Sequence, residues 1–256
     1  MRELNDILGY KNLKIYQDTD YFKFSLDSVI LANYANIRLK DKKICDLGTG
    51  NGVVPLILSK RTKNDLYCVE IQKKLYDLAI DSFKYNNIID RVTSFNCDIG
   101  DTSVFKFNEY FDLVLCNPPY FKISDKSYLN LSIEKQYARH EVTMDLDKLF
   151  SVSFRILKNG GNLVIVHRPD RFMEILDNMR KYKLEPKRIK FIYNNVNSES
   201  KLMLIECQKN GKEGLIIDKP LILYNLDNTM SDEYSSLINE VREWYKKVIM
   251  IRLLYT

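Results

Sequence analysis

The four residues Asn117-Pro118-Pro119-Tyr120 are the most distinctive chemical group in the sequence. Asn117 precedes a proline and therefore favours extended geometry, and the two prolines fix φ and supply no N–H donor. We expect a stiff turn that presents two acceptors, the Asn117 side-chain oxygen and the Pro118 carbonyl, beside the flat ring of Tyr120. Two acceptors can hold both hydrogens of an exocyclic amine and aim its lone pair at a methyl donor, while the ring stacks on a base. The alternative is a proline-stiffened loop with a packed tyrosine.

A glycine cluster forms a second candidate site. Three of the nine glycines of the chain lie within Gly48–Gly52, after an apolar run and before a helical pattern. Glycines at such a position let the chain turn sharply and let the backbone approach a ligand. The spacing is Gly-x-Gly-x-Gly, and Val53 stands where a dinucleotide-binding turn has its last glycine, which disfavours a nicotinamide dehydrogenase.

Acidic residues end three successive predicted strands: Asp46, Glu70 and Asp98. In an open α/β sheet the carboxyl ends of the strands frame the ligand crevice. A carboxylate at Glu70 can accept hydrogen bonds from two ribose hydroxyls, and one at Asp98 can accept from an adenine amino group. The alternative is three solvated strand ends.

The glycine turn and the acidic strand ends together resemble the class I S-adenosylmethionine-dependent methyltransferases. The resemblance implies S-adenosyl-L-methionine as cofactor. It implies that the cofactor is bound by Asp46, Gly48, Thr49, Gly50, Asn51, Gly52, Glu70, Ile71, Asp98, Ile99 and Asn117. The Asn-Pro-Pro-Tyr motif in turn resembles that of the amino-methyltransferases, which implies a catalytic role for Asn117, Pro118 and Tyr120.

Short apolar runs alternate with longer amphipathic runs through the middle of the chain, which is typical of βαβ units and a largely parallel sheet. Strands are predicted at Lys43–Leu47, Leu66–Ile71, Val92–Cys97, Phe111–Cys116, Asn162–His167, Arg188–Tyr193 and Leu202–Cys207. Helices are predicted at Leu26–Ile37, Val53–Lys60, Lys73–Asn86, Leu146–Leu157 and Arg171–Tyr182. We therefore predict an α/β, Rossmann-like class I methyltransferase fold: a seven-stranded, mostly parallel sheet with helices on both faces and an antiparallel hairpin at the end.

Two further elements flank this core: a strand over Leu215–Tyr224 and a final helix over Ser231–Lys247. We expect residues 1–256 to form one methyltransferase domain. Its parts are a covering segment over about 1–40, a core over about 41–210 and the C-terminal strand and helix over about 211–249. At the start of the first predicted helix, Ser25 and Asp27 can approach the cofactor or cap the helix, and for Asp27 capping is expected.

Several stretches resemble one bacterial family, the valine-tRNA adenine-N6 methyltransferases, which modify the adenine 3′ of the anticodon. The resemblance extends over roughly residues 10–247. It is carried, in the order of the family, by Leu13–Ile15, Phe24–Val29, Glu70–Gln72, Asn117–Phe121, Ala138–Glu141, His167–Pro169, Met179–Tyr182 and Leu184–Ile189. It implies methylation of N6 of adenine-37 in a valine tRNA, and tRNA as the partner.

Basic residues are concentrated in residues 178–191, which hold six Lys or Arg against one Glu. Such a cluster can follow phosphates, although it can equally be a solvated helix face. A polar stretch of 23 residues, 121–143, follows the Asn-Pro-Pro-Tyr motif and suggests a lid or substrate-binding loop. For Arg139, His140 and Arg168 two roles remain open: contact with the tRNA, or hydrogen bonds that only order their loops. The candidate RNA-binding residues are Arg139, His140, Arg168, Arg180, Lys181, Lys187 and Arg188.

Composition narrows the class of protein. The net charge of +5 permits a polyanionic partner without requiring one. With only two histidines a His-rich metal site is nearly excluded, and we expect no metal. The five cysteines lie in apolar stretches without a Cys-x-x-Cys pair, as in reduced cytosolic proteins. We expect a cytoplasmic protein with no membrane partner, and a monomer.

Other functions remain open. The same motif serves amino-methyltransferases of rRNA, of DNA adenine and of protein glutamine, and a non-catalytic RNA-binding protein can have the same fold. Glutamine enzymes of this kind usually carry an extra N-terminal helical domain, and only about 40 residues precede the first predicted core strand here. The sequence does not identify the tRNA species, the base context, the oligomeric state or the role of residues 250–256.

Overall fold

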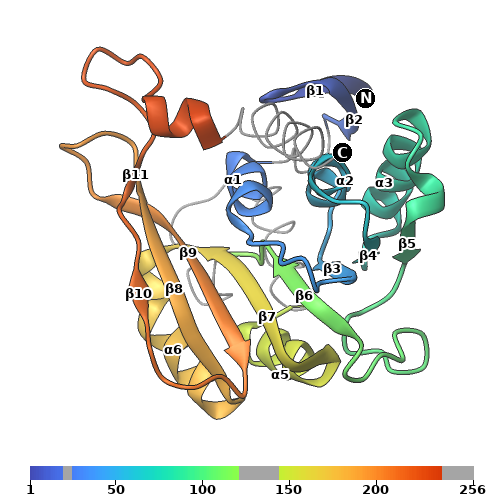
Figure 1. The fold of residues 1–256 in the computed structure, drawn as a ribbon. Coiled ribbons are helices and arrows are strands. Elements are labelled where there is room, and N and C mark those ends of the chain that lie inside the picture. The colour runs from blue at the N-terminus through green and yellow to red at the C-terminus, as the bar shows by residue number, and fades with distance from the viewer. Residues whose placement is uncertain (20–24, 121–143, 238–256) are drawn as a thin grey trace, which may run out of the picture.

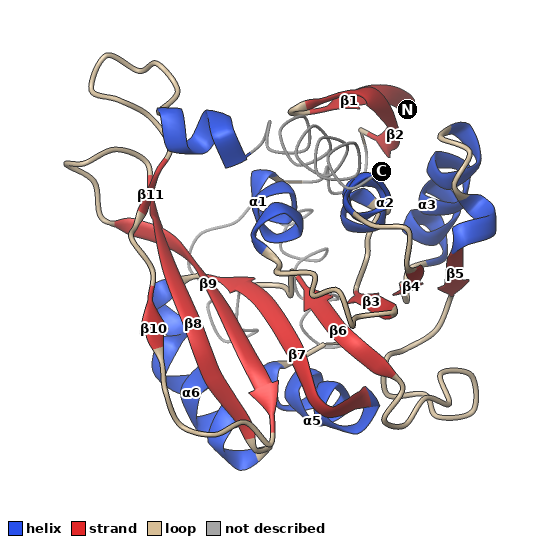
Figure 2. Ribbon diagram, in the orientation of Figure 1, coloured by secondary structure: helices blue, strands red, loops and turns tan. Residues whose placement is uncertain are grey.

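The computed structural model describes residues 1–19, 25–120 and 144–237. A nine-stranded sheet is the centre of the described structure (Figure 1, Figure 2). Its spatial order is β10 (Ile216–Ile217), β8 (Leu184–Tyr193), β9 (Ser200–Lys209), β7 (Leu157–His167), β6 (Phe111–Cys116), β3 (Lys43–Leu47), β4 (Asp65–Val69) and β5 (Val92–Phe95), with β11 (Leu221–Ile222) also paired to β8.

Strand β9 is antiparallel to both of its neighbours, β7 and β8, and every other pair in this sheet is parallel. All seven predicted strands and the antiparallel β8–β9 hairpin are therefore confirmed. The predicted count of seven strands is wrong, because residues 215–224 also join the sheet. They pair with the free edge of β8 as two short strands, β10 and β11, and the segment between them contains Pro220, which has no N–H to donate.

Helices cover both faces of the sheet, as predicted. On one face α1 (Leu26–Tyr34), α2 (Val53–Arg61) and α3 (Lys73–Tyr85) share a core with alternate sheet residues such as Ile44 and Leu113. On the other face α5 (Leu146–Ile156) and α6 (Phe172–Lys181) pack on residues such as Cys45 and Val114. Figure 1 shows α5 and α6 behind the sheet and α1 in front of it. Because neighbouring residues of one strand enter opposite cores, the strands read as continuous apolar runs.

A two-stranded antiparallel sheet, β1 (Arg2–Ile7) and β2 (Tyr10–Asp18), precedes α1 and was not predicted. It packs on α3: the Tyr16 N–H donates to Ser82 Oγ at 2.9 Å, and the Lys14 N–H donates to Asn86 Oδ1 at 3.0 Å. Asn51, in the glycine turn, donates to the Tyr16 carbonyl at 3.2 Å. The small sheet thereby holds the outer side of the turn.

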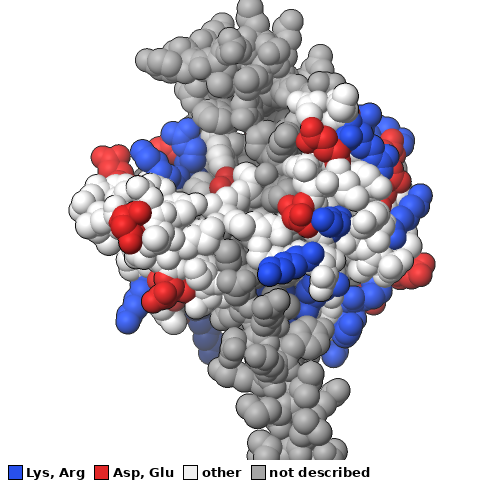
Figure 3. Space-filling view, turned by 90° about the horizontal axis from the view of Figure 1, so that it is seen from above, with Lys and Arg blue, Asp and Glu red and all other residues white. Residues whose placement is uncertain are grey.

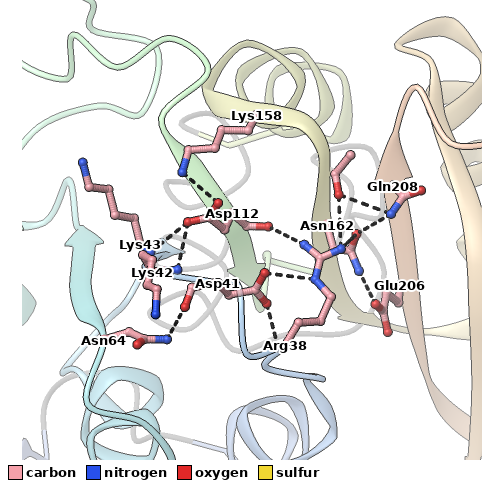
Figure 4. A network of polar contacts seen from close by, with 11 residues as sticks. Arg38, Asp41, Lys42, Lys43, Asn64, Asp112, Lys158, Asn162, Glu206 and Gln208 are labelled. Atoms are coloured by element: carbon pink, nitrogen blue, oxygen red, sulfur yellow. Dashed lines mark hydrogen bonds and ion pairs between the residues drawn. The ribbon is translucent and has the colours of Figure 1, made fainter.

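The amino ends of the central strands are joined by a network of polar groups, of which Asp41, Asn162 and Glu206 are buried (Figure 4). Arg38 donates to the fully buried Asp41 at 2.9 Å, and to Asn162 and the Asp112 carbonyl at 3.3 Å. The Asp112 carboxylate accepts from the N–H groups of Lys42 and Lys43 at 2.9 and 3.0 Å. Although burial opposes it, these bonds and the Lys158 ammonium hold the pKa of Asp112 below its usual value. This edge of the sheet is closed by its own side chains.

Of the final helix predicted at Ser231–Lys247, the structure describes residues 232–237, which are helical. The remainder, together with the predicted loop 121–143, lies outside the described residues. Among the residues that are described, no helix has both the length and the apolar character needed to cross a membrane.

Candidate active site

A cavity of about 320 Å³ opens at the carboxyl ends of β3, β4 and β6, opposite the closed edge. Predicted site residues that line it are Gly48, Thr49, Gly50, Asn51, Glu70, Ile71, Asp98, Ile99, Asn117, Pro118 and Tyr120. Asp46 and Gly52 lie behind the cavity wall. Sequence reasoning missed Leu75, Cys97 and Met144, which also line the cavity and carry no motif that would mark them. It also gave no role to Ser28, a lining residue within the resembling stretch Phe24–Val29.

The glycine turn has backbone conformations that favour glycine: φ is +71° at Gly48, +58° at Gly50 and +89° at Gly52. The surroundings of these glycines differ. A side chain at Gly50 would meet open space, whereas a Cβ at Gly52 would lie 2.6 Å from the ring of Phe83. Gly50 therefore keeps the backbone free for a ligand, and Gly52 lets the turn pack on α3.

Glu70 joins the glycine turn to the end of β4. Its Oε2 accepts from the Gly50 N–H at 2.9 Å and its Oε1 from the Gln72 N–H at 2.8 Å. Burial raises the pKa of the Glu70 carboxyl, and the two backbone donors oppose that rise. Each carboxylate oxygen has a further lone pair, so Glu70 can accept from a pair of adjacent hydroxyls on a ligand.

Asp46 lies behind the glycine turn and is almost fully buried. Burial raises its pKa to about 7. Within the described part of the chain, Asp46 Oδ2 and the neighbouring Thr49 Oγ1 are both buried without a hydrogen-bond partner. A buried carboxylate behind the turn favours a cationic ligand over a pyrophosphate.

Asp98 lies at the rim of the same cavity. Its Oδ1 accepts from the Gly100 N–H at 2.7 Å, and its Oδ2 forms an ion pair with Lys148 of α5 at 2.5 Å. Ile99 beside it is buried and forms an apolar wall. A flat ring can therefore lie against Ile99, with its polar edge toward Asp98.

Asn117 and Tyr120 follow β6 directly and meet the start of α1. Asn117 Nδ2 lies 2.8 Å from Ser28 Oγ, and Asn117 Oδ1 lies 2.7 Å from the Tyr120 hydroxyl. The same hydroxyl donates to Asp27 Oδ2 at 2.7 Å. The expected helix-capping role of Asp27 is therefore wrong, because its carboxylate turns to the motif. Burial and the Asp27 charge raise the pKa of Tyr120 well above its ordinary value, so its proton stays on.

His167, at the end of β7, packs beside Tyr120 with the ring centres 5.2 Å apart. Its Nδ1 accepts from the Arg168 N–H at 2.8 Å, which leaves the proton of the neutral ring on Nε2. Burial lowers the pKa of His167 to about 4. The ring is thus neutral at physiological pH and supports the tyrosine by packing.

The candidate RNA-binding residues do not form one surface. Arg180 and Lys181 lie on α6, paired with Asp177 and Asp147. On the opposite face of the sheet Arg188 pairs with Glu206 and Asp218 and lies over the Tyr34 ring of α1. Arg168 follows β7 and pairs with Asp170, and Lys187 donates to the Lys212 carbonyl. Arg139 and His140 lie outside the described residues.

Charges on one face of the molecule are visible in Figure 3, a view from above. Lys and Arg side chains are most numerous on the right, the side on which α3 lies in Figure 1, and Asp and Glu lie among them. On α3 itself, Lys73 pairs with Asp77 and Lys84 with Asp81. No group of three or more His, Cys, Asp or Glu side chains able to hold a metal occurs among the described residues.

The strand order, the glycine turn and the acidic strand ends at the open edge define a class I methyltransferase fold. Solved structures agree. A predicted O-methyltransferase from Agrobacterium tumefaciens has a TM-score of 0.68 at 19% identity, covering 85% of this chain and 97% of its own. Geranyl diphosphate C-methyltransferase from Streptomyces coelicolor A3(2), crystallised with S-adenosyl-L-homocysteine, has a TM-score of 0.51 at 16% identity, covering 71% of this chain and 74% of its own.

The family model described as Eco57I restriction-modification methylase matches residues 37–200, and the chain belongs to that family. Curated relatives are named tRNA1(Val) (adenine(37)-N6)-methyltransferase. The one from Cytophaga hutchinsonii is 28% identical over 78% of this chain and 81% of its own. The one from Phocaeicola vulgatus is 26% identical over 92% of this chain and 97% of its own.

Proposed function

We propose that this protein is a tRNA methyltransferase that uses S-adenosyl-L-methionine to methylate N6 of adenine-37 in a valine tRNA. The observation that carries the proposal is the position of the Asn117-Pro118 acceptors in the wall of the cavity that the glycine turn forms. The names of the curated relatives supply the substrate class.

The residues of the cavity fit this cofactor. Glu70 offers two oxygens to a ribose, Asp98 and Ile99 suit an adenine, and the turn at Gly50 leaves space for the amino acid part. The Asp46 carboxylate lies behind the turn with its Oδ2 buried and unpaired, and when ionised it favours a ligand with positive charge. When bound, S-adenosyl-L-methionine supplies a methyl group activated by its sulfonium.

The target base is held by the motif after β6. The Asn117 oxygen and the Pro118 carbonyl accept the two hydrogens of the exocyclic amine, which turns the nitrogen lone pair toward the cofactor side. Tyr120 offers its ring to the base. No general base is required before transfer, because the additional proton of the alkylated nitrogen passes to water afterwards. A base in an RNA loop is already unpaired, so extruding it costs less than extruding a base from duplex DNA.

Basic side chains bind a tRNA through its phosphates. Arg168 follows His167, whose ring packs beside Tyr120, and its side chain is 40% exposed. We assign phosphate contact to Arg168, and to Arg139 and His140 in the segment after the motif. Arg180, Lys181 and Lys187 do not line the cavity, and we assign them phosphate contacts elsewhere on the tRNA, made in exchange for their bonds to Asp177, Asp147 and the Lys212 carbonyl. Arg188 is engaged in two ion pairs, which favours a structural role for it.

Methylation of DNA adenine is the second candidate, favoured by the description of the family model. Transfer of labelled methyl to separate pools of tRNA, rRNA, DNA and protein distinguishes the two, with Asn117→Ala as the control. We expect label in tRNA as N6-methyladenosine, absent with the variant. Label in DNA alone would refute the tRNA substrate and retain the chemistry, and label in protein alone would refute both nucleic-acid candidates.

A further inference from the structure

The first turn of α1 is joined to the catalytic motif across about 90 residues of sequence. Ser25, the N-cap residue of α1, makes no capping hydrogen bond through its side chain. The two polar side chains that follow, Asp27 and Ser28, instead contact Tyr120 and Asn117 at 2.7 and 2.8 Å. Both also line the cavity. The start of the helix therefore faces the reacting groups rather than its own backbone.

The number of protons in this cluster limits how its members can bond. The Tyr120 hydroxyl has one proton and lies 2.7 Å from both Asp27 Oδ2 and Asn117 Oδ1. An ionised carboxylate only accepts, so the tyrosine proton goes to Asp27 and the tyrosine oxygen is left as an acceptor. Two oxygens 2.7 Å apart with no proton between them would repel each other.

The conflict disappears when the Asn117 amide is turned end for end. Its nitrogen then donates to the Tyr120 oxygen, and its oxygen accepts from the Ser28 hydroxyl. The two ends of a carboxamide have nearly the same shape, so the exchange displaces no other atom. In this arrangement each of the three contacts has one donor and one acceptor, and the chain runs from Ser28 through Asn117 and Tyr120 to Asp27.

We propose that Asp27 and Ser28 are positioning residues that fix the orientation of the Asn117 amide, Asp27 acting through the Tyr120 hydroxyl. The inference rests on the proposed amino-methyltransferase function and names the residues that orient the acceptor, the Asn117 amide oxygen. Donation from the amide nitrogen toward the negative charge of Asp27 draws electron density onto the amide oxygen. That oxygen, which keeps one lone pair beside Ser28, becomes a better acceptor for the hydrogens of the target amine.

The consequence is energetic coupling between Asp27 and Tyr120. Tyr120→Phe keeps the ring and removes only the hydroxyl, and we expect kcat for tRNA methylation to fall about five- to tenfold, the factor expected for about 1 kcal/mol from one hydrogen bond. Asp27→Asn should lower kcat by a similar factor. The double variant should be no slower than Tyr120→Phe alone, because Asp27 acts only through that hydroxyl. The KM for tRNA should stay within about twofold.

A matched control separates this effect from loss of a helix charge. Asp77→Asn removes an exposed aspartate from α3, paired with Lys73 and away from the motif, and should leave kcat unchanged. If Asp27 served only to stabilise α1, its effect on kcat would persist in the Tyr120→Phe background. If the loss of kcat in the double variant equalled the product of the losses in the two single variants, the proposal would be overturned.

A second readout needs neither substrate nor activity. In protein labelled with ¹⁵N-asparagine, the side-chain NH₂ signals of Asn117 are identified by their absence from Asn117→Ala. We expect Tyr120→Phe and Asp27→Asn to move them in the same direction, and Asp77→Asn to leave them in place. Unmoved Asn117 signals in both variants would overturn the proposed hydrogen-bond relay from Asp27 through Tyr120 to Asn117, even if methylation were impaired. Moved signals in a protein that methylates no nucleic acid would refute the proposed function and keep the relay.

Discussion

Substitution of two glycines in the same turn by alanine tests how the site is built. Gly50 and Gly52 both have positive φ, +58° and +89°, so Ala at either position carries a similar backbone cost of about 1–2 kcal/mol. Only at Gly52 does the added methyl collide with a neighbour, at 2.6 Å from Phe83 Cε1 and 3.1 Å from Ala79 Cβ. Phe83 is fully buried, and relieving such overpacking costs about 1–3 kcal/mol more.

We therefore expect Gly52→Ala to lose about 2–5 kcal/mol of unfolding free energy and Gly50→Ala about 1–2 kcal/mol, measured by urea denaturation followed by circular dichroism. Binding of S-adenosyl-L-methionine, measured by calorimetry, should show the opposite order. Gly50→Ala places its methyl in open space at the cavity and should weaken binding at least about tenfold, the equivalent of about 1.4 kcal/mol. Equal destabilisation by the two substitutions would refute the assignment of Gly52 to packing and Gly50 to the ligand.

Three further outcomes test the site. Asn117→Ala should lower kcat at least about 100-fold, as expected when a preorganised transition-state contact is lost, while calorimetry gives an unchanged affinity for S-adenosyl-L-methionine; a parallel loss of affinity would contradict a role limited to the target amine. Glu70→Ala should weaken that affinity at least about tenfold, since both the ligand acceptors and the bond to Gly50 disappear, and retained binding in the calorimeter would remove Glu70 from the cofactor site. For His167 the pKa is about 4 in the folded chain against 6.5 ordinarily, so between these values the unfolded chain binds a proton that the folded chain does not. Stability should consequently fall as the pH drops from 6.5 to 4, by up to about 3 kcal/mol, and a urea series with His167→Phe should lose that part of the slope; an unchanged slope would show that His167 is protonated in the folded state.

The central fold was predictable because its signals are local. Ten residues, 43–52, contain an apolar run, the carboxylate of Asp46 and three glycines. The same order of strand, turn and helix recurs around Glu70. The small β1–β2 sheet was not predictable in this way. Its backbone bonds to Ser82 and Asn86 span 66 and 72 residues, and its buried residues, such as Leu13, acquire their partners only when α3 is in place.

The basic stretch 178–191 shows a different limit. Proximity in sequence suggested one surface, but the stretch contains the end of α6, a turn and the start of β8. A strand sends alternate side chains to opposite faces, and Arg188 turns to the α1 side, away from α6. Net charge in a segment therefore predicts a surface only where the segment is a single element with one exposed face.

The two edges of the sheet explain why the site is where it is. At the amino edge the buried polar groups bond to one another: Arg38 connects Asp41, Asn162 and the Asp112 carbonyl. At the carboxyl edge, by contrast, Asp46 Oδ2 and Thr49 Oγ1 are buried without partners among the described residues. An unsatisfied buried group costs stability in the free protein, and of these two residues only Thr49 lines the cavity, where a ligand can bond to it. We therefore expect the cofactor to stabilise the fold from the carboxyl edge, where the chain leaves its own polar groups unpaired.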